Sequence, residues 1–189
     1  MSLYSKYRPD SFEKMKGDYA YVGQMISKPD CNHAFLLLGP KGTGKTTTAR
    51  ICLTQLGMED FDIDEYNFAD TRGIDTVRQI IGDSKYGGLH GFIIDEVHKA
   101  TEEAQQAMLK LLEDIPPNVY YFLCTSEPQK MIPALRDRPT RIPFHALSKS
   151  DMEDLILEVS KAEGKPVRRQ AAVMIVEKAE GGMGAVLKD

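Results

Sequence analysis

The sequence predicts an α/β fold in which a mainly parallel, five-stranded sheet is covered by helices on both faces. Three observations predict it. Short strand-like runs alternate with helix-compatible segments, a glycine-rich loop joins the first run to a helix, and the pattern becomes purely helical after about residue 147. We therefore expect one domain over residues 1–146, with ligands at the carboxyl ends of its strands, and an all-helical domain over residues 147–189.

Five segments have the character of β-strands: Ala34 to Leu38, Phe61 to Asn67, Gly91 to Asp95, Val119 to Ser126, and Arg141 to His145. Between the third and the fourth, apolar residues recur three and four positions apart, namely Ala104, Ala107, Met108, Leu111 and Leu112. This spacing predicts an amphipathic helix. The pair Pro116-Pro117 ends it, because proline cannot donate the next helical hydrogen bond.

The last part of the chain predicts two helices. Ser150 and Glu153 have the spacing of a capping box at the start of the first helix. Its apolar stripe consists of Met152, Leu155, Ile156 and Val159. The second helix follows Pro166, and its apolar face comprises Ala171, Ala172, Ile175, Val176 and Ala179. The pair Gly181-Gly182 is expected to end this second helix.

Composition limits the classes of function. The chain has 189 residues, 42% hydrophobic and 28% charged, which suits one ordinary domain core and a small additional one. We expect a cytoplasmic protein with no membrane contact, because no run approaches the roughly 20 apolar residues of a membrane span. Three cysteines and four histidines are scattered, which predicts no zinc site. A net charge of −4 argues against a free-standing nucleic-acid binder, although a local basic patch is compatible with it.

A phosphate-binding loop is the most informative motif. It follows the first strand and consists of Gly39, Pro40, Lys41, Gly42, Thr43, Gly44, Lys45 and Thr46, with Thr47 opening the next helical segment. Its glycines allow backbone N–H groups to converge on phosphate oxygens. Lys45 can reach the β- and γ-phosphates of ATP, and the Thr46 hydroxyl can bind Mg²⁺. An ordinary glycine- and proline-containing turn is the alternative, but here every fixed position of the motif is filled.

Two adjacent carboxylates, Asp95 and Glu96, end the third predicted strand. Asp95 would hold Mg²⁺ through its water shell, and Glu96 would orient and deprotonate the attacking water. Such a pair alone is more often a solvated strand end. Fifty residues after Lys45, in a chain with a phosphate loop, it indicates catalysis instead. We expect His98 only to begin the next helix.

Thr125 and Ser126 end the fourth predicted strand. A hydroxyl there can hydrogen-bond the attacking water or the γ-phosphate, as a further catalytic group. A strand-terminating turn would look the same, and the spacing does not separate the two interpretations.

Six short sequence motifs are distributed over nearly the whole chain. They are Tyr4-Ser5-Lys6-Tyr7-Arg8-Pro9 with Phe12, the loop at 39–46, Thr71-Arg72-Gly73-Ile74-Asp75 with Arg78, Ile94-Asp95-Glu96-Val97-His98, Ala104-Gln105-Gln106-Ala107 with Leu112-Glu113, and Thr125-Ser126-Glu127-Pro128-Gln129-Lys130. In order and spacing they resemble the AAA+ ATPases, and within them the motor subunits of sliding-clamp loaders, especially the gamma/tau type of bacterial DNA polymerase III. The resemblance implies a P-loop NTPase fold with a helical lid domain, and ATP and Mg²⁺ as cofactors.

The resemblance also assigns roles to single residues. Tyr7, Arg8 and Pro9 would pack beside the adenine, with a plain N-terminal arm as the alternative. Ser126 would take the sensor 1 position, with Thr125 beside it.

Arg138 resembles the arginine with which this family reaches the ATP of a neighbouring subunit. A planar, permanent cation suits the charge of a transferring phosphoryl group. In this chain Asp137 and Pro139 replace the serine and cysteine that flank that arginine in the family. Unspecialised surface arginines are therefore the alternative.

Three departures from the family stand out. The four-cysteine zinc module after the phosphate-loop helix is reduced to Cys52. Gly184 occupies the sensor 2 arginine position, and Lys188 lies one turn later. The collar domain through which loader subunits assemble is also missing from the sequence.

The leading hypothesis is an ATP-hydrolysing motor subunit of a sliding-clamp loader. Its partners would be other loader subunits, the sliding clamp, and primer–template DNA bound without sequence preference. Another AAA+ DNA motor, for branch migration or replication repair, is the second hypothesis. A nucleotide-binding scaffold with little turnover is the third, and Gly184 makes it credible.

Overall fold

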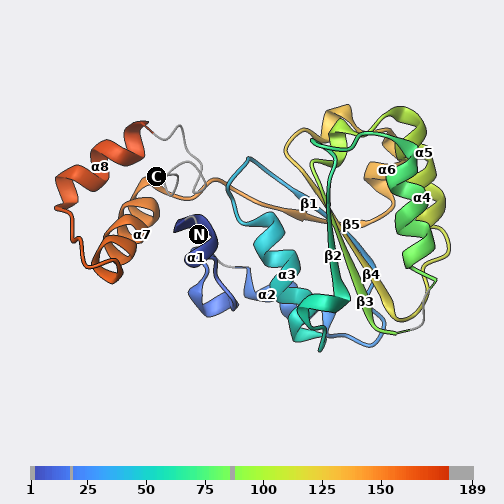
Figure 1. Cartoon of the computed structure of the whole chain (residues 1–189), viewed down its shortest axis with the longest axis horizontal. Helices are drawn as coiled ribbons and strands as arrows, with labels where there is room; N and C mark the ends of the chain where they lie inside the picture. The colour runs from blue at the N-terminus through green and yellow to red at the C-terminus, as the bar shows by residue number, and fades with distance from the viewer. Residues whose placement is uncertain (1–2, 18, 86–87, 179–189) are drawn as a thin grey trace.

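The computed structural model describes residues 3–17, 19–85 and 88–178. A five-stranded sheet forms its centre, as predicted (Figure 1). The strands are β1 (Ala34–Leu38), β2 (Ile63–Asn67), β3 (His90–Asp95), β4 (Val119–Thr125) and β5 (Thr140–Pro143). Their order is β2-β3-β4-β1-β5, and every neighbouring pair is parallel. All carboxyl ends therefore meet at one edge of the sheet.

The second strand begins two residues later than the sequence predicts. Phe61 and Asp62 belong instead to a short 3-10 segment, η2 (Asp60–Asp62), in which the Glu59 and Asp62 side chains each accept a backbone hydrogen bond from the other residue. This local capping box satisfies N–H groups that an extended chain would offer to a partner strand.

Helices cover both faces of the sheet (Figure 1). On one face lie α2 (Ala20–Ile26) and α3 (Lys45–Gln55), and on the other lie α4 (Ile74–Asp83), α5 (Glu102–Leu111) and α6 (Pro133–Asp137). The remaining short elements are α1 (Leu3–Lys6), η1 (Phe12–Lys14), η3 (Val97–Lys99) and η4 (Pro128–Lys130). The predicted amphipathic helix is α5, which ends at Leu111.

Side chains alternate between two hydrophobic cores along each central strand. Leu37, Ile93 and Phe122 belong to the core under α3, whereas Leu36 and Phe92 belong to the core under α4 and α5. Because both faces of the sheet are buried, the sequences of these strands are apolar at nearly every position. It also fixes the register, because a shift by one residue would exchange the two cores.

Two further helices, α7 (Lys149–Ala162) and α8 (Arg169–Lys178), pack on each other around a core of their own, formed by Met152, Ile156, Ala172 and Val176. This separate core supports the proposed division after residue 146. The predicted cap at Ser150 is wrong: Ser148 caps α7 by accepting a hydrogen bond from the Asp151 N–H at 3.1 Å. Ser148 and Asp151 are three residues apart, as are Ser150 and Glu153. Ser148 is the cap because it lies just outside the helix, in the extended conformation that a capping residue adopts.

The predicted end of α8 at Gly181-Gly182 lies outside the described residues, as do Ala179, Gly184 and Lys188. In the part of the chain that the structure describes, no helix combines the length and apolar character that a bilayer crossing requires.

Candidate active site

The phosphate loop lies between β1 and α3, at the carboxyl edge of the sheet. Gly42 and Gly44 have φ angles of 75° and 91°, a backbone conformation that glycine adopts without steric cost. Gly44 is the N-cap of α3 and, as a glycine, cannot cap that helix with a side chain. The first N–H groups of α3, which have no partner within the helix, therefore face the loop with the positive end of the helix dipole.

Gly39 is needed because the loop passes against the end of β5. The N–H of Phe144 donates to the carbonyl of Leu38 at 2.6 Å, and a Cβ on Gly39 would lie 2.2 Å from the carbonyl oxygen of Phe144. Since that oxygen belongs to the backbone, a side chain at position 39 would force β5 away from β1.

Replacing Gly39 by alanine is therefore expected to lower the free energy of unfolding by about 2 kcal/mol, in the range of overpacked cores. Urea unfolding of the nucleotide-free chain measures it. Gly82→Ala is the matched control, because a Cβ there meets nothing within 4 Å in helix α4. It should raise the stability by roughly 0.5–1 kcal/mol. Equal stabilities of Gly39→Ala and the parent would contradict the close approach.

Lys45 opens α3, and its ammonium lies inside the curve of the loop. It is buried and donates hydrogen bonds to the carbonyls of Gly39 at 2.8 Å and Pro40 at 2.7 Å. Burial lowers the pKa of Lys45. Two neutral carbonyls thus position the cation without cancelling its charge, which leaves it able to attract an anion.

The two predicted magnesium ligands, Thr46 in the first turn of α3 and Asp95 at the end of β3, come together although β4 lies between β3 and β1. The Thr46 hydroxyl donates to Oδ2 of Asp95 at 3.0 Å, across the carboxyl edge of the sheet. The other carboxylate oxygen of Asp95 accepts the N–H of Glu96 at 2.9 Å. A hydroxyl and a carboxylate at this separation are the hard oxygen ligands that Mg²⁺ prefers, so these residues fit the ion.

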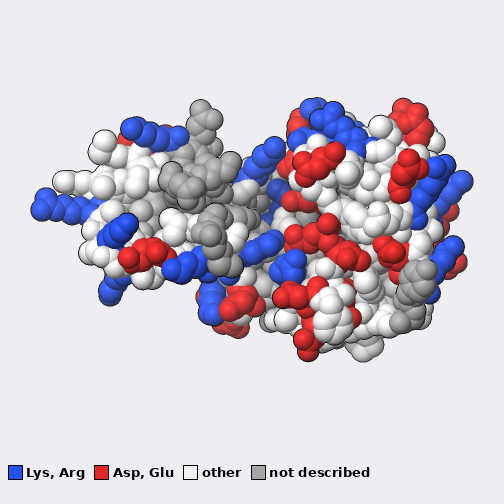
Figure 2. Space-filling view, in the orientation of Figure 1, with Lys and Arg blue, Asp and Glu red and all other residues white. Residues whose placement is uncertain are grey.

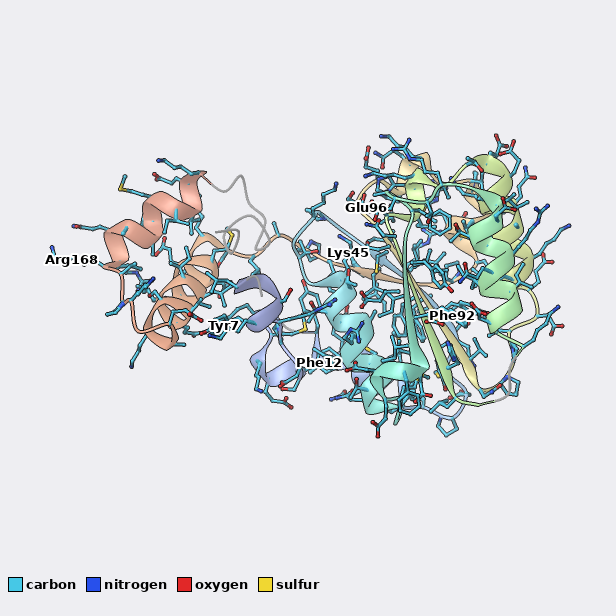
Figure 3. The ribbon with its side chains drawn as sticks, viewed as in Figure 1. Tyr7, Phe12, Lys45, Phe92, Glu96 and Arg168 are labelled. Atoms are coloured by element: carbon cyan, nitrogen blue, oxygen red, sulfur yellow. The ribbon has the colours of Figure 1, made fainter. Side chains whose placement is uncertain are left out.

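Glu96 lies at the same edge as Lys45 (Figure 3). Among the described residues it is the one non-glycine with a positive φ, 53°. Its side chain is 14% exposed, and Oε2 is buried without a hydrogen bond to any described residue. The nearest cations are the ammonium groups of Lys99 at 3.6 Å and Lys41 at 3.7 Å. Strained backbone and an unsatisfied buried oxygen are both features that concentrate at functional sites.

Thr125 is fully buried, and its hydroxyl and its backbone carbonyl both have hydrogen-bond partners inside the protein. Its hydroxyl accepts the N–H of Glu127 at 3.1 Å and lies 2.9 Å from Nδ1 of His98, while its carbonyl accepts the N–H of Gly39 at 3.1 Å. Ser126 follows at the carboxyl end of β4 and is partly exposed. Thr125 therefore joins β4 to the phosphate loop, whereas Ser126 is the residue of the pair nearer to solvent.

His98 is a residue whose position the sequence reasoning missed. It lies in η3 rather than in the next long helix, and its side chain is 1% exposed. Its Nε2 is 3.3 Å from Oε2 of Glu96 and 3.3 Å from Oε1 of Glu127. Its position two residues after Glu96, the predicted base, was the one feature of the sequence that could have pointed to this location.

The N-terminal arm connects the phosphate-loop helix to α7. Arg8 donates to the Thr47 hydroxyl at 3.3 Å and pairs with Glu65 of β2 at 3.7 Å. Tyr7 donates to Glu163, which follows α7, at 2.6 Å. Figure 3 shows Tyr7 on the α7 side of α3, and Figure 2 shows basic and acidic side chains interspersed over this face.

Two clefts adjoin this arm. One of about 370 Å³ is lined by Tyr7, Arg8 and Pro9 together with residues of α7. The other, of about 430 Å³, is lined by residues that sequence reasoning did not select, namely Gly17, Tyr19, Tyr21, Pro143, His145, Ala146, Leu147, Ser148 and Asp151. Tyr19, which lines the second cleft, stacks on Phe144 at 4.3 Å, and Phe144 packs against Gly39 of the phosphate loop.

Arg138 lies away from these groups. Its guanidinium donates to the carbonyls of Leu112 at 3.1 Å and Glu113 at 3.4 Å, at the C-terminal end of α5. Helix α5 starts beyond the carboxyl end of β3 and runs back toward the amino ends of the strands. Arg138 is therefore at the opposite edge of the sheet, so within one chain it does not complete the site.

Comparison with known proteins places the chain in a family. Residues 35–149 match the ATPase family associated with various cellular activities (AAA). Among curated proteins, the chain is 30% identical to DNA polymerase III subunit gamma/tau of Mycobacterium tuberculosis over 96% of this chain and 36% of that protein. It is 31% identical to replication factor C subunit 4 of Encephalitozoon cuniculi over 96% of this chain and 61% of that protein. The chain thus spans less than two thirds of these relatives.

Solved structures show the same fold at lower identity. The Thermotoga maritima RuvB Holliday junction branch migration motor superposes with a TM-score of 0.75 and 17% identity, over 96% of this chain and 63% of that one. A second structure of RuvB from the same organism gives a TM-score of 0.79 and 18% identity over the same shares. With a family match over more than half of its length, this chain belongs to the AAA family of ATPases.

Proposed function

We propose that this chain binds and hydrolyses ATP with Mg²⁺ as a motor subunit of a sliding-clamp loader. The observation that carries the proposal is the 3.0 Å contact between Thr46 and Asp95, next to Glu96 and the phosphate loop. This contact supports a site in which a phosphate anchor, two metal ligands and a candidate base would share one edge of the sheet.

Lys45 and the N–H groups at the start of α3 would hold the β- and γ-phosphates. Thr46 and Asp95 would hold Mg²⁺, which neutralises phosphate charge when bound. Glu96 would orient a water in line with the γ-phosphate and accept its proton as the new P–O bond forms and the bond to ADP breaks. Ser126 is the candidate for a hydrogen bond to that water or phosphate.

The nucleoside end would lie along the N-terminal arm. Tyr7, Arg8 and Pro9 stay candidates for packing beside the adenine. The cleft beside Tyr19 is a second candidate, since Tyr19 stacks on Phe144, which packs against Gly39 of the loop.

The loader assignment rests on the relatives, two of which are subunits of DNA polymerase III and replication factor C. The location of Arg138 is consistent with an assembly of several subunits. Because it lies at the far edge of the sheet, Arg138 could contribute to hydrolysis only at the site of a neighbouring subunit. We therefore infer other loader subunits, a sliding clamp and primer–template DNA as partners, and the cytoplasm as the place of action.

Turnover by the isolated chain is expected to be slow and to rise by about tenfold or more when loader subunits, clamp and primed DNA are supplied, because an arginine supplied in trans makes a large contribution to kcat. Steady-state phosphate release, with each addition tested singly, measures this. Omission of primed DNA alone serves as the control.

Full activity without any addition would contradict the need for a neighbouring subunit. Stimulation by a four-way junction instead of clamp and primer would favour a branch-migration motor, whose fold this chain shares. Tight ATP binding without phosphate release under every condition would favour a scaffold.

A further inference from the structure

His98 is a buried histidine between the ends of β3 and β4, and both of its ring nitrogens face polar groups. Nδ1 is 2.9 Å from the Thr125 hydroxyl. Nε2 is 3.3 Å from Oε2 of Glu96 and 3.3 Å from Oε1 of Glu127. The ring thus spans from the fourth strand to the candidate base.

The surroundings select one tautomer. The carboxylates that face Nε2 can only accept hydrogen bonds, whereas the Thr125 hydroxyl, which accepts the N–H of Glu127, can also donate its O–H to Nδ1 of His98. The proton of the neutral ring then resides on Nε2 and points at the carboxylates. The opposite tautomer would aim a lone pair at two carboxylate oxygens. Burial lowers the pKa of His98, which favours the neutral ring with a single N–H.

This tautomer also accounts for two buried atoms that have no assigned hydrogen bond. Oε2 of Glu96 and Nε2 of His98 are both unsatisfied among the described residues, and they are 3.3 Å apart. Unsatisfied buried polar atoms are rare and costly, so a small adjustment that pairs them is favoured.

We propose that His98 is a positioning residue for hydrolysis, whose Nε2–H orients the Glu96 carboxylate while Thr125 fixes the ring. The inference rests on the proposed function, in which Glu96 is the base. Glu127 lies at the same distance and is itself paired with Lys130 at 2.6 Å, so the ring N–H has a second acceptor and its contact with Glu96 can be released.

Kinetics test the role with two variants. Glutamine can place a donor near the position of Nε2, whereas asparagine is too short to reach Glu96. We expect His98→Asn to lower kcat by about 10- to 100-fold, as misorientation of a catalytic group does, with KM and ATP affinity unchanged. His98→Gln should recover part of the loss. His90→Asn, at the amino end of β3, is the matched control and should leave kcat unchanged.

The outcomes separate this inference from the function on which it rests. If His98→Asn hydrolyses ATP like the parent while Glu96→Gln does not, the positioning role is overturned and the function stands. A rise in KM at constant kcat would also overturn it. If Glu96→Gln itself hydrolyses like the parent, the proposed function fails.

A spectroscopic measurement reports the ring tautomer without nucleotide and without turnover. Long-range ¹H–¹⁵N spectra of chain labelled at its four histidines report the tautomer of each ring. The His98 signals are those that disappear in His98→Asn. We expect the Nε2–H tautomer, with a shift of its nitrogen in Glu96→Gln. An Nδ1–H tautomer would overturn the proposal.

Discussion

Replacing Glu96 by glutamine is expected to lower the rate of ATP hydrolysis by about 100- to 10,000-fold, the range that general-base catalysis contributes. ATP affinity should be retained. The amide keeps the size of the side chain and can still accept a hydrogen bond from His98, but it cannot take a proton from water. The phosphate anchor at Lys45 and the oxygen pair of Thr46 and Asp95 are left in place.

Phosphate release at saturating ATP and Mg²⁺ measures the rate, and equilibrium titration with ATP measures affinity. Glu103→Gln, on the exposed first turn of α5, is the matched control and should change neither quantity. Hydrolysis by Glu96→Gln at the parental rate would show that another group activates water. Loss of ATP binding together with the rate would instead make Glu96 part of the binding site.

The sheet and the loop were predictable because their signals are local. Strands buried on both faces must be apolar throughout, as Leu36, Leu37 and Phe92 are, and a loop that curls around phosphates requires glycines at fixed spacing. The convergence of Thr46 and Asp95 followed from topology, since parallel strands place their carboxyl ends at one edge.

The surroundings of Glu96 were not predictable in the same way. Whether His98 points into the protein depends on the positive φ of Glu96 and on contacts with β4, which lies 20 or more residues later in the chain. Strand-end hydroxyls raise the same problem. Spacing treats Thr125 and Ser126 alike, but Thr125 is the last residue of β4, which is buried on both faces, whereas Ser126 lies just after the strand and is partly exposed.

Capping and clefts also depend on information beyond a local pattern. Ser148 and Ser150 both have an acidic residue three positions later, and only the path of the chain out of β5 decides which one caps α7. The cleft beside Tyr19 combines residues at and just before α2 with residues from the end of β5 to the start of α7, and no spacing in the sequence links them.

Replacing Lys45 by methionine is expected to weaken ATP binding by about 100-fold or more. A charge-assisted hydrogen bond contributes about 1.5–3 kcal/mol, and Lys45 would make such bonds to two phosphates, so a loss of about 3 kcal/mol follows. Methionine keeps the length and apolar character of the buried stem. It removes the two hydrogen bonds to Gly39 and Pro40, so stability must be measured in parallel.

The comparison of two measurements separates these effects of the Lys45 substitution. A purely structural role would lower the urea midpoint of the nucleotide-free chain and leave the stability added by a fixed ATP concentration unchanged, because at fixed concentration this increase depends on the affinity of ATP for the folded state. A phosphate-binding role lowers the ATP-dependent increase by up to about 3 kcal/mol at the same ATP concentration. Lys110→Met, on the exposed side of α5, controls for loss of a positive charge and should retain the full increase. An unchanged ATP affinity in a folded Lys45→Met chain would contradict the nucleotide site, since no other ammonium donates to the carbonyls of this loop within the described ranges.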